Sequence, residues 1–379
     1  MRSRMSARHY LSDEVFARER VDIFRKLWLF GGLRTMLDAH NAFITREVAG
    51  VPVVIQNFNG ELRAFENVCL HRSARLQWET VGRRPLLCRY HGWGYNVAGA
   101  PENIPLHDEL YRFGSDERKS LQLRRFALMV AGNLVFINLD PDPMPFEEQF
   151  SPDFIASMSS SSNAYDGEVM STTLHGRFNW KLAYENLRDA NHPRFVHAQS
   201  LAKNVEFVAR VDPMLDAESR GPAGAQSQAE RNAKLRRFSF GGPEASLGGS
   251  IGYTWRDHVL RWGSQDAYFN WLAYPNLHIA SSDGGHSFTI EHHVPVAPDR
   301  TDIEIYWMTA KKHRRYAYSS AVLASLMHGS NLVVGEDIRV MEEVQSGLHP
   351  DAPPGTQGAY EGRNRLVERW YTTLVDGDA

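Results

Sequence analysis

The chain has 379 residues, of which 42% are hydrophobic and 23% are charged, a balance typical of globular proteins that excludes global disorder. Its length predicts two domains. With a net charge of −3, the chain has no basic excess to attract a nucleic acid. No apolar run reaches the ~18–20 residues of a membrane helix, and the basic N-terminus lacks the apolar stretch of a secretory signal. We therefore expect a cytoplasmic protein with no nucleic-acid or membrane partner.

The N-terminal third is predicted to be a helix followed by a small β domain. Ser12 can cap the helix, which should end near Gly31–Gly32. From about residue 30 to 141, short β-rich runs are separated by turn residues. Asn59–Gly60 lies between two such runs and is a strong hairpin signal, because both central positions of the tight turn need positive φ. This region therefore reads as a small antiparallel β domain.

A second domain is predicted after the three prolines of residues 140–145, which cannot join a sheet or helix interior. It mixes helix and strand. Its predicted helices cover residues 179–191, ending before Pro193, and residues 317–348, and its strand-like runs cover residues 268–280, 287–296 and 303–309. Residues 213–250 are rich in Gly, Ala, Ser and charge, and we expect them to form a mobile excursion or lid.

The first cluster of metal-binding residue types uses both cysteines of the chain. Cys69 and His71 lie in one predicted loop, and Cys88 and His91 lie in another. A Rieske [2Fe–2S] centre is held by two cysteines on one iron and two histidines on the other, which matches one of each from each loop. A structural zinc ion and two unrelated buried thiols remain alternatives. The Cys-x-His spacing is tighter than zinc loops usually have. Trp93 and Tyr90 would shield such a cluster from water.

The second cluster combines two histidines with an acid from a distant helix. Asp189 and His192 are predicted to share a helix face, Pro193 turns the chain, and His197 follows one turn later. Asp337 falls on the apolar stripe of the long C-terminal helix, where a carboxylate is costly unless it is paired or binds a metal. Two histidines and one carboxylate form the facial triad of non-haem Fe(II) oxygenases.

The second cluster also has simpler explanations. His192 and His197 can be ordinary polar residues at a helix end, and Asp337 can pair with Arg339 or a lysine. The neighbouring acids Glu336 and Glu343 lie off the apolar stripe, and we expect them to be solvated. The aromatic and aliphatic candidates for a substrate pocket, each also a candidate for the core, are Phe195, Phe269, Trp271, Leu277 and Trp307.

Residues 67–95 resemble the Rieske loops of the aromatic-ring-hydroxylating oxygenase large (alpha) subunits. The resemblance extends from Trp28 to Leu348, and it departs from the family pattern at Leu70, where Pro is common, and at Ser73, where Gly is common. It implies an α+β fold with an N-terminal helix (residues 1–30) that packs on the catalytic domain, a small antiparallel β Rieske domain (31–141) and a helix-grip catalytic domain (142–379). In the helix-grip fold, an antiparallel sheet wraps on a long C-terminal helix.

The resemblance also implies roles for individual residues. It implies that Cys69, His71, Cys88 and His91 bind a [2Fe–2S] cluster, and that His192, His197 and Asp337 bind Fe²⁺. Asp189 would link the Rieske His91 of one chain to His192 of the next, carrying electrons between subunits. Asn186 would lie just outside the iron ligands.

The implied function is the terminal oxygenase of a multicomponent system that hydroxylates, and by expectation dihydroxylates, an aromatic substrate with O₂. The chain lacks a dinucleotide-binding glycine motif, so NAD(P)H must act through a separate reductase, with or without a ferredoxin. A homotrimer is implied, with or without a small beta subunit. The alternatives are a Rieske monooxygenase or oxidative demethylase of a non-aromatic or methylated substrate, a Rieske electron carrier with a ligand-binding domain, and a zinc hydrolase.

Overall fold

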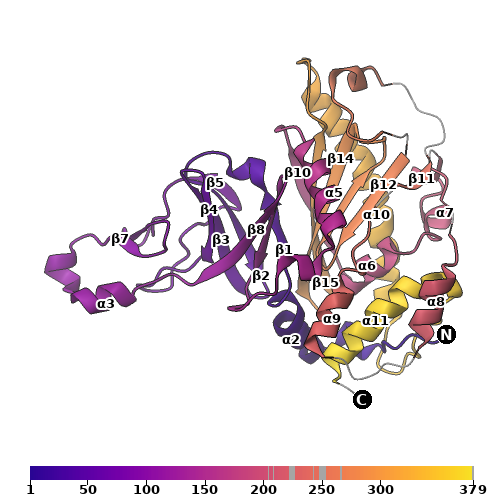
Figure 1. The fold of residues 1–379 in the computed structure, drawn as a ribbon, viewed down its shortest axis with the longest axis horizontal. Helices are drawn as coiled ribbons and strands as arrows, with labels where there is room; N and C mark the ends of the chain where they lie inside the picture. Colours follow the sequence, from indigo (N-terminus) through magenta and orange to yellow (C-terminus); the bar gives the residue numbers. More distant parts are fainter. Residues whose placement is uncertain are drawn as a thin grey trace. The chain divides into compact units, whose positions relative to one another are not determined.

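The computed structural model describes residues 1–203, 205–207, 209–221, 227–241, 243–246, 253–264 and 267–377 (Figure 1). The chain divides into two compact units. The larger combines Met1–Asp22 with Glu147–Ala379, and the smaller is Ile23–Phe146. None of the helices in the described ranges combines the length and the hydrophobicity that a membrane crossing requires.

The smaller unit is built on a seven-stranded antiparallel sheet. Its strand order is β1 (Leu29–Leu33), β9 (Leu134–Asn138), β8 (Arg125–Ala131), β4 (Glu61–Glu66), β3 (Val51–Phe58), β2 (Ala42–Val48) and β5 (Val81–Arg83). The predicted hairpin is confirmed, because Phe58 pairs with Glu61 across a turn in which Asn59 and Gly60 have φ of 54° and 98°. The prediction that a helix ends near Gly31–Gly32 is wrong, because both glycines lie inside β1.

Side-chain alternation along these strands builds the support for both cysteines. Val54 and Phe65 point to one face of the sheet and pack in a buried cluster with Cys69 and Cys88. Val53 and the other alternate residues point to the opposite face and form a separate core. The two cysteine loops are therefore anchored to the sheet by the ordinary two-residue period of its strands. A short ribbon of β6 (Gly94–Tyr95) and β7 (Pro101–Asn103) follows the second loop.

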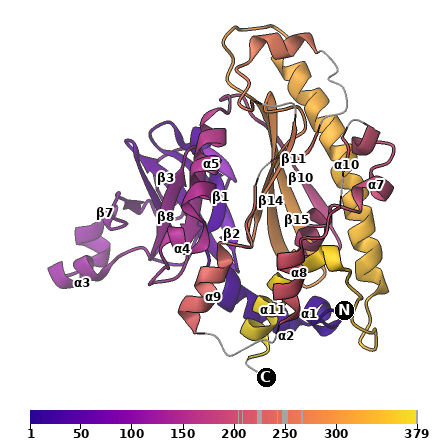
Figure 2. The ribbon, with the colours of Figure 1, turned by 45° about the vertical axis from the view of Figure 1, so that its right-hand side comes forward.

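The larger unit is built on a six-stranded antiparallel sheet. Its order is β10 (Met170–Gly176), β15 (Arg300–Thr309), β14 (Ser287–Ala297), β13 (Leu277–Ser281), β12 (Ala267–Ala273) and β11 (Pro243–Ser246). The long helix α10 (Ser319–Gly347) runs along one face of this sheet, and Phe154 of α5 (Pro152–Asn163) packs against Trp271 on the other (Figure 2). The predicted antiparallel sheet with a long C-terminal helix is confirmed.

Three predictions for the larger unit differ from the structure. Residues 268–280 form two strands rather than one, because Pro275 interrupts the ladder in the turn between β12 and β13. The described parts of the predicted excursion form α8 (Pro213–Arg220) and α9 (Gln228–Leu235), whereas residues 222–226, 242 and 247–250 of it lie outside the described residues. Helical spacing places Val344 on the same apolar stripe as Asp337, but its side chain is exposed.

The N-terminal segment is tied to the helix that leads into the candidate iron site. Ser12 caps α2 (Asp13–Glu19), as predicted, by accepting a hydrogen bond from the Val15 N–H. At the other end of α2, the fully buried Glu19 carboxylate accepts hydrogen bonds from Lys181 Nζ (2.5 Å) and Trp180 Nε1 (2.8 Å). Because a buried carboxylate needs such partners, these bonds fix the start of α6 (Trp180–Leu187) against the N-terminal helix.

Candidate metal centres and substrate cavity

Two tight turns in the smaller unit hold the cysteine–histidine pairs. The Ser73 N–H donates to the Cys69 carbonyl (3.0 Å), and the Gly92 N–H donates to the Cys88 carbonyl (2.9 Å), so each turn closes around its pair. Both closing residues have left-handed backbone, with φ of 57° at Ser73 and 74° at Gly92. Ser73, one of the two departures from the family pattern that the sequence resembles, therefore occupies a conformation that favours glycine. The turn still forms with serine in that position.

The four candidate cluster ligands converge. Cys69 and Cys88 are each 2% exposed, and the Nδ1 atoms of His71 and His91 lie 3.1 Å apart. The His71 ring stacks on buried Trp93, with centroids 5.2 Å apart and an angle of 6°. The ring of Tyr90 lies 3.9 Å from that of His91 but is 58% exposed, so Tyr90 does not bury the cluster as Trp93 does. The thiols thus face the core, and the imidazoles lie nearer the surface.

Tyr95 reaches the sulfur of Cys69 with its hydroxyl group. The oxygen accepts a hydrogen bond from the Leu70 N–H (3.0 Å), which directs the O–H toward Cys69 Sγ at 3.2 Å. Burial raises the pKa of the Cys69 thiol, and the hydrogen bond from Tyr95 opposes that effect. A cluster iron would hold this cysteine as the thiolate, which Tyr95 can then stabilise.

The spacing of these four residues fits two metal ions better than one. In the part of the chain that the structure describes, one group of at least three His, Cys, Asp or Glu side chains has all of its possible ligand atoms within 4.8 Å of one another. Neither cysteine belongs to this group. Ligands of a single tetrahedral zinc ion would lie that close together, because each is about 2.0–2.3 Å from the metal. Two thiols and two imidazoles spread over a wider site match the donor set of a [2Fe–2S] cluster.

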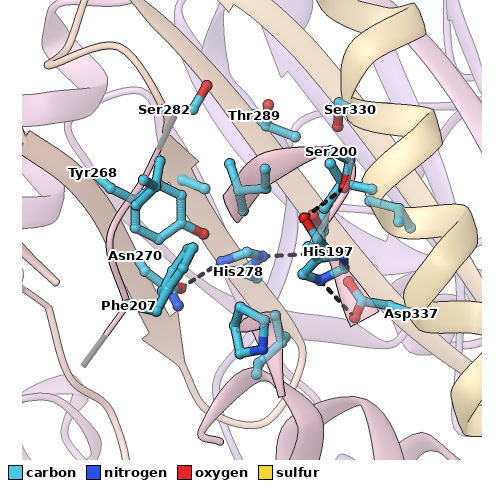
Figure 3. A pocket seen from close by; sticks show the side chains of 18 of the residues that line it. His197, Ser200, Phe207, Tyr268, Asn270, His278, Ser282, Thr289, Ser330 and Asp337 are labelled. Atoms are coloured by element: carbon cyan, nitrogen blue, oxygen red, sulfur yellow. Dashed lines mark hydrogen bonds and ion pairs between the residues drawn. The ribbon is translucent and has the colours of Figure 1, made fainter. Parts of the chain in front are cut away.

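The residues whose ligand atoms do lie within 4.8 Å of one another are His192, His197 and Asp337, in the larger unit. Figure 3 labels His197 and Asp337. Asp337 Oδ1 lies 3.1 Å from His197 Nε2 and 3.4 Å from His192 Nε2. Burial alone would raise the pKa of Asp337, but the hydrogen bonds from His192 and His197 outweigh it and hold the pKa below its ordinary value. An ionised carboxylate with two imidazole Nε2 atoms fits the Fe(II) facial triad.

The backbone between α6 and α7 (Pro193–Val196) orients His192. The prediction that Asp189 and His192 share a helix face is wrong, because α6 ends at Leu187. The Asp189 carboxylate accepts the Asn191 N–H (2.8 Å), which gives the backbone an alternative to the next helical turn. The Asp189 carbonyl lies 2.6 Å from His192 Nδ1 and accepts its proton. The other ring nitrogen, Nε2, then faces Asp337 and is the atom that would bind a metal.

Two side chains surround the triad. Asn186 Nδ2 donates to Asp337 Oδ1 (2.8 Å), so the structure brings Asn186 next to the iron ligands that the sequence analysis named. Glu336 was predicted to be solvated, and this is wrong. Its Oε2 lies 2.8 Å from His197 Nδ1 and accepts a hydrogen bond from Ser200 Oγ (2.6 Å). Nothing in the helical periodicity of α10 indicated this contact, because it depends on the side from which His197 approaches.

A cavity of about 980 Å³ opens beside the triad. His192, His197 and Asp337 contribute to its wall, and α10 supplies small and aliphatic side chains. The sheet supplies Glu291 together with Asn270, His278 and Thr289, the last three of which are labelled in Figure 3. The five predicted pocket residues do not line it. Phe195 is 75% exposed, and Trp271, Leu277 and Trp307 are buried in the core. On β12, Tyr268 and Asn270 face the cavity, so Phe269 and Trp271 point away by alternation.

A row of polar side chains crosses the sheet wall of this cavity. His278 and Glu291 are direct partners on β13 and β14, with His278 Nδ1 3.0 Å from Glu291 Oε2. His278 Nε2 lies 2.6 Å from Asn270 Oδ1 on the next strand. Burial would raise the pKa of Glu291, but its contacts with His278 and His293 hold that pKa well below its ordinary value. The sheet wall therefore carries a buried carboxylate.

Comparison with known proteins finds a family match within each of the two units. Residues 165–377 match the family described as "Ring hydroxylating alpha subunit (catalytic domain)", and residues 30–114 match the "Rieske [2Fe-2S] domain". The chain belongs to the ring-hydroxylating alpha-subunit family. Its cofactors are accordingly a Rieske [2Fe–2S] cluster in the region of residues 30–114 and a mononuclear iron in the region of residues 165–377.

Several oxygenase subunits are similar in sequence. The oxygenase subunit of glycine betaine monooxygenase from Pseudomonas aeruginosa (strain UCBPP-PA14) is 31% identical over 211 residues, covering 54% of this chain and 47% of that protein. The carnitine monooxygenase oxygenase subunit of Escherichia coli (strain K12) is 27% identical, covering 49% and 50%. The large component of a Pseudomonas aeruginosa naphthalene 1,2-dioxygenase system is 28% identical, covering 50% and 43%. The chain thus spans about half the length of these relatives.

Solved structures extend the similarity of fold over nearly the whole chain. A quaternary ammonium Rieske monooxygenase has a TM-score of 0.73 at 20% identity, covering 97% of this chain and 94% of that chain. Naphthalene 1,2-dioxygenase from Rhodococcus sp. has a TM-score of 0.67 at 16% identity, covering 99% and 95%. At these identities the likeness establishes the fold of the alpha subunits and no more.

Proposed function

We propose that this chain is the terminal oxygenase of a Rieske system, which oxidises a small substrate with O₂ and with electrons from a separate NAD(P)H reductase. The observation that carries the proposal is the convergence of His192, His197 and Asp337 at the wall of a large cavity, in a chain with a Rieske domain. In this proposal these three residues bind Fe²⁺, and Cys69, His71, Cys88 and His91 bind the cluster.

The two cofactors together would supply the one-electron steps that O₂ needs to oxidise a substrate, and the side chains of this chain would prepare the site. His192 and His197 each have the Nδ1 atom occupied by an acceptor, which leaves Nε2 for the metal. Asn186 holds one oxygen of Asp337 by donating to it. The cavity beside the triad gives the substrate a place near the iron.

We propose further that the substrate is polar and that the reaction is a monooxygenation, such as the oxidation of a methylated, non-aromatic compound. Asn270, His278 and Glu291 line the cavity although His278 and Glu291 are only 3% and 7% exposed. A hydrocarbon lying over this row would offer no hydrogen bond to the polar groups that the row presents to the cavity, whereas a polar substrate can. The similarity to glycine betaine and carnitine monooxygenase subunits supports the same class of substrate.

Dihydroxylation of an aromatic ring is the second candidate. Phe207 and Tyr268 line the cavity as an edge-to-face pair with centroids 5.6 Å apart, a surface on which a flat ring can pack. The similarity to the naphthalene dioxygenase component supports this alternative. We favour the polar substrate because the row of Asn270, His278 and Glu291 is contributed by three adjacent strands and is therefore a fixed part of the cavity.

Turnover with ¹⁸O₂ tests the proposal. The purified protein, with a surrogate reductase and NADH, is supplied in parallel with glycine betaine, carnitine and naphthalene, and products are identified by mass. We expect ¹⁸O in the hydroxylated product of a methylated polar substrate, or release of formaldehyde, whose own label exchanges with water, and no oxidation by the Asp337→Ala variant. Dihydroxylated naphthalene as the main product would favour the second candidate. Equal product from Asp337→Ala would refute the oxygenase site.

A further inference from the structure

We propose that Glu336 is a positioning residue of the mononuclear iron centre, orienting His197 and strengthening its bond to the metal. The inference rests on the ligand set of the proposed function. It adds a residue that touches neither substrate nor iron and acts only through His197.

Two consecutive acids of the helix α10 contact the two ring nitrogens of His197. Glu336 and Asp337 are consecutive on α10, so their side chains leave the helix about 100° apart. His197 Nδ1 lies 2.8 Å from Glu336 Oε2, and His197 Nε2 lies 3.1 Å from Asp337 Oδ1. The ring is 2% exposed and therefore has little freedom to rotate. Since Glu336 accepts the Nδ1 proton, Nε2 is left as the metal-binding atom.

The environment of Glu336 favours a fixed carboxylate. Its side chain is 23% exposed, so it keeps partial contact with water and avoids the full penalty of a buried charge. Ser200 Oγ donates to the same Oε2 atom at 2.6 Å, which holds the carboxylate in place. Ser200 lies three residues after His197, so the same short segment supplies both donors to Glu336.

The two histidine ligands therefore differ in the acceptor behind them. His192 donates its Nδ1 proton to the neutral backbone carbonyl of Asp189, whereas His197 donates to a carboxylate. A charged acceptor makes the stronger hydrogen bond and raises the basicity of the ring, and loss of such outer partners typically weakens metal affinity about 10–100-fold. We infer that His197 is the stronger donor of the pair because of Glu336.

The test measures Fe²⁺ affinity rather than activity. Protein with an intact cluster is freed of mononuclear iron and titrated anaerobically with Fe²⁺ against a chelator, and the cluster absorbance serves as an internal standard. Glu336→Ala should bind Fe²⁺ about 10–100-fold more weakly than wild type. Glu336→Gln keeps an acceptor oxygen without the charge and should fall between the two. The matched control is Glu343→Gln, an exposed acid two turns along the same helix, which should bind as wild type.

Three outcomes separate the possibilities. Wild-type affinity in Glu336→Ala, while Asp337→Ala loses the metal, would overturn the role of Glu336 but leave the ligand set standing. Wild-type affinity in Asp337→Ala would instead refute the ligand set on which the inference rests. A loss in Glu336→Ala accompanied by an equal loss in Glu343→Gln, or by a lowered melting temperature, would mean that Glu336 acts through the stability of α10 and would also overturn the proposal.

Discussion

At the scale of single residues, Tyr95 controls the environment of the cluster through one hydroxyl group. Its O–H points at Cys69 Sγ because its oxygen already accepts the Leu70 N–H. A hydrogen bond to a cluster thiolate stabilises the more negative, reduced state and raises the reduction potential. The effect belongs to the hydroxyl rather than to the ring, so it can be tested by removing a single atom.

Tyr95→Phe should lower the reduction potential of the cluster by tens of millivolts. The potential falls by roughly 60 mV for each 1.4 kcal/mol by which the reduced cluster loses stability relative to the oxidised cluster. A spectroelectrochemical titration measures the potential. Tyr111→Phe is the control, because the Tyr111 ring contacts both His71 and Trp93, with centroids 5.3 Å away in each case, and the substitution keeps that ring. An unchanged potential in Tyr95→Phe would show that the 3.2 Å contact does not act on the cluster.

The metal-binding residues are the part of the site that the sequence predicts best. The Cys-x-His and Cys-x-x-His spacings identify cluster loops because the ligands of each loop must reach one small site. Asp337 could be found because an acid is conspicuous on an apolar helical stripe. Glu336 could not, since an acid one position away looks like an ordinary solvated residue until the approach of His197 is known. The polar row of Asn270, His278 and Glu291 depends on strand register, which the sequence does not specify.

At the scale of elements, the two cluster loops depend on backbone that L-residues rarely adopt. Gly92 has φ of +74°, and a Cβ added there would lie 2.9 Å from Pro105 Cγ. Gly94, two residues later in β6, would place a Cβ no closer than 3.5 Å to its neighbours. The two glycines therefore form a natural pair for comparison within the same loop.

Gly92→Ala should destabilise the second loop by roughly 1–3 kcal/mol and lower the cluster content of the purified protein, because it combines left-handed backbone with a close contact. Gly94→Ala should retain the cluster. The ratio of cluster absorbance to protein, together with the melting temperature, provides the measurement. If both variants kept the full cluster and the wild-type melting temperature, the loop would not depend on this conformation.

The ends of elements were the least predictable features. The strands of the smaller unit and the long helix were recognisable because their periodicity extends over many residues. The end of α6 was placed too late, because the Asp189 carboxylate competes for backbone N–H groups in a way that apolar periodicity does not reflect. That error matters for the site, because it moves His192 from a helix face to a turn where the Asp189 carbonyl orients it.

At the scale of the whole molecule, electrons must travel from the cluster to the mononuclear iron. We propose, as the family resemblance implies, that three chains form a ring in which the cluster of one chain serves the iron of the next. A head-to-tail contact of this kind can close into a ring. Asp189 would then link His91 of one chain to His192 of its neighbour. Within a single chain its carboxylate holds Asn191, which keeps it beside the iron ligands.

Complementation between inactive variants tests this route. Cys88→Ser removes a cluster ligand, Asp337→Ala removes an iron ligand, and each should be inactive alone. Co-expressed, they should recover part of the activity, because some junctions pair an intact cluster with an intact iron site. Asp189→Ala should keep both metal centres but lose turnover. Absence of recovery in verified mixed trimers, or a fully active monomer, would exclude electron transfer between subunits.

The most direct test of the central claim is the iron content of Asp337→Ala. Wild-type protein should contain about three iron atoms per chain, two in the cluster and one at the facial triad. Asp337→Ala should contain about two, with the cluster spectrum unchanged, because the lost iron comes only from His192, His197 and Asp337. If Asp337→Ala retained about three iron atoms, or if wild-type protein contained only about two, the mononuclear iron site would not lie at these residues.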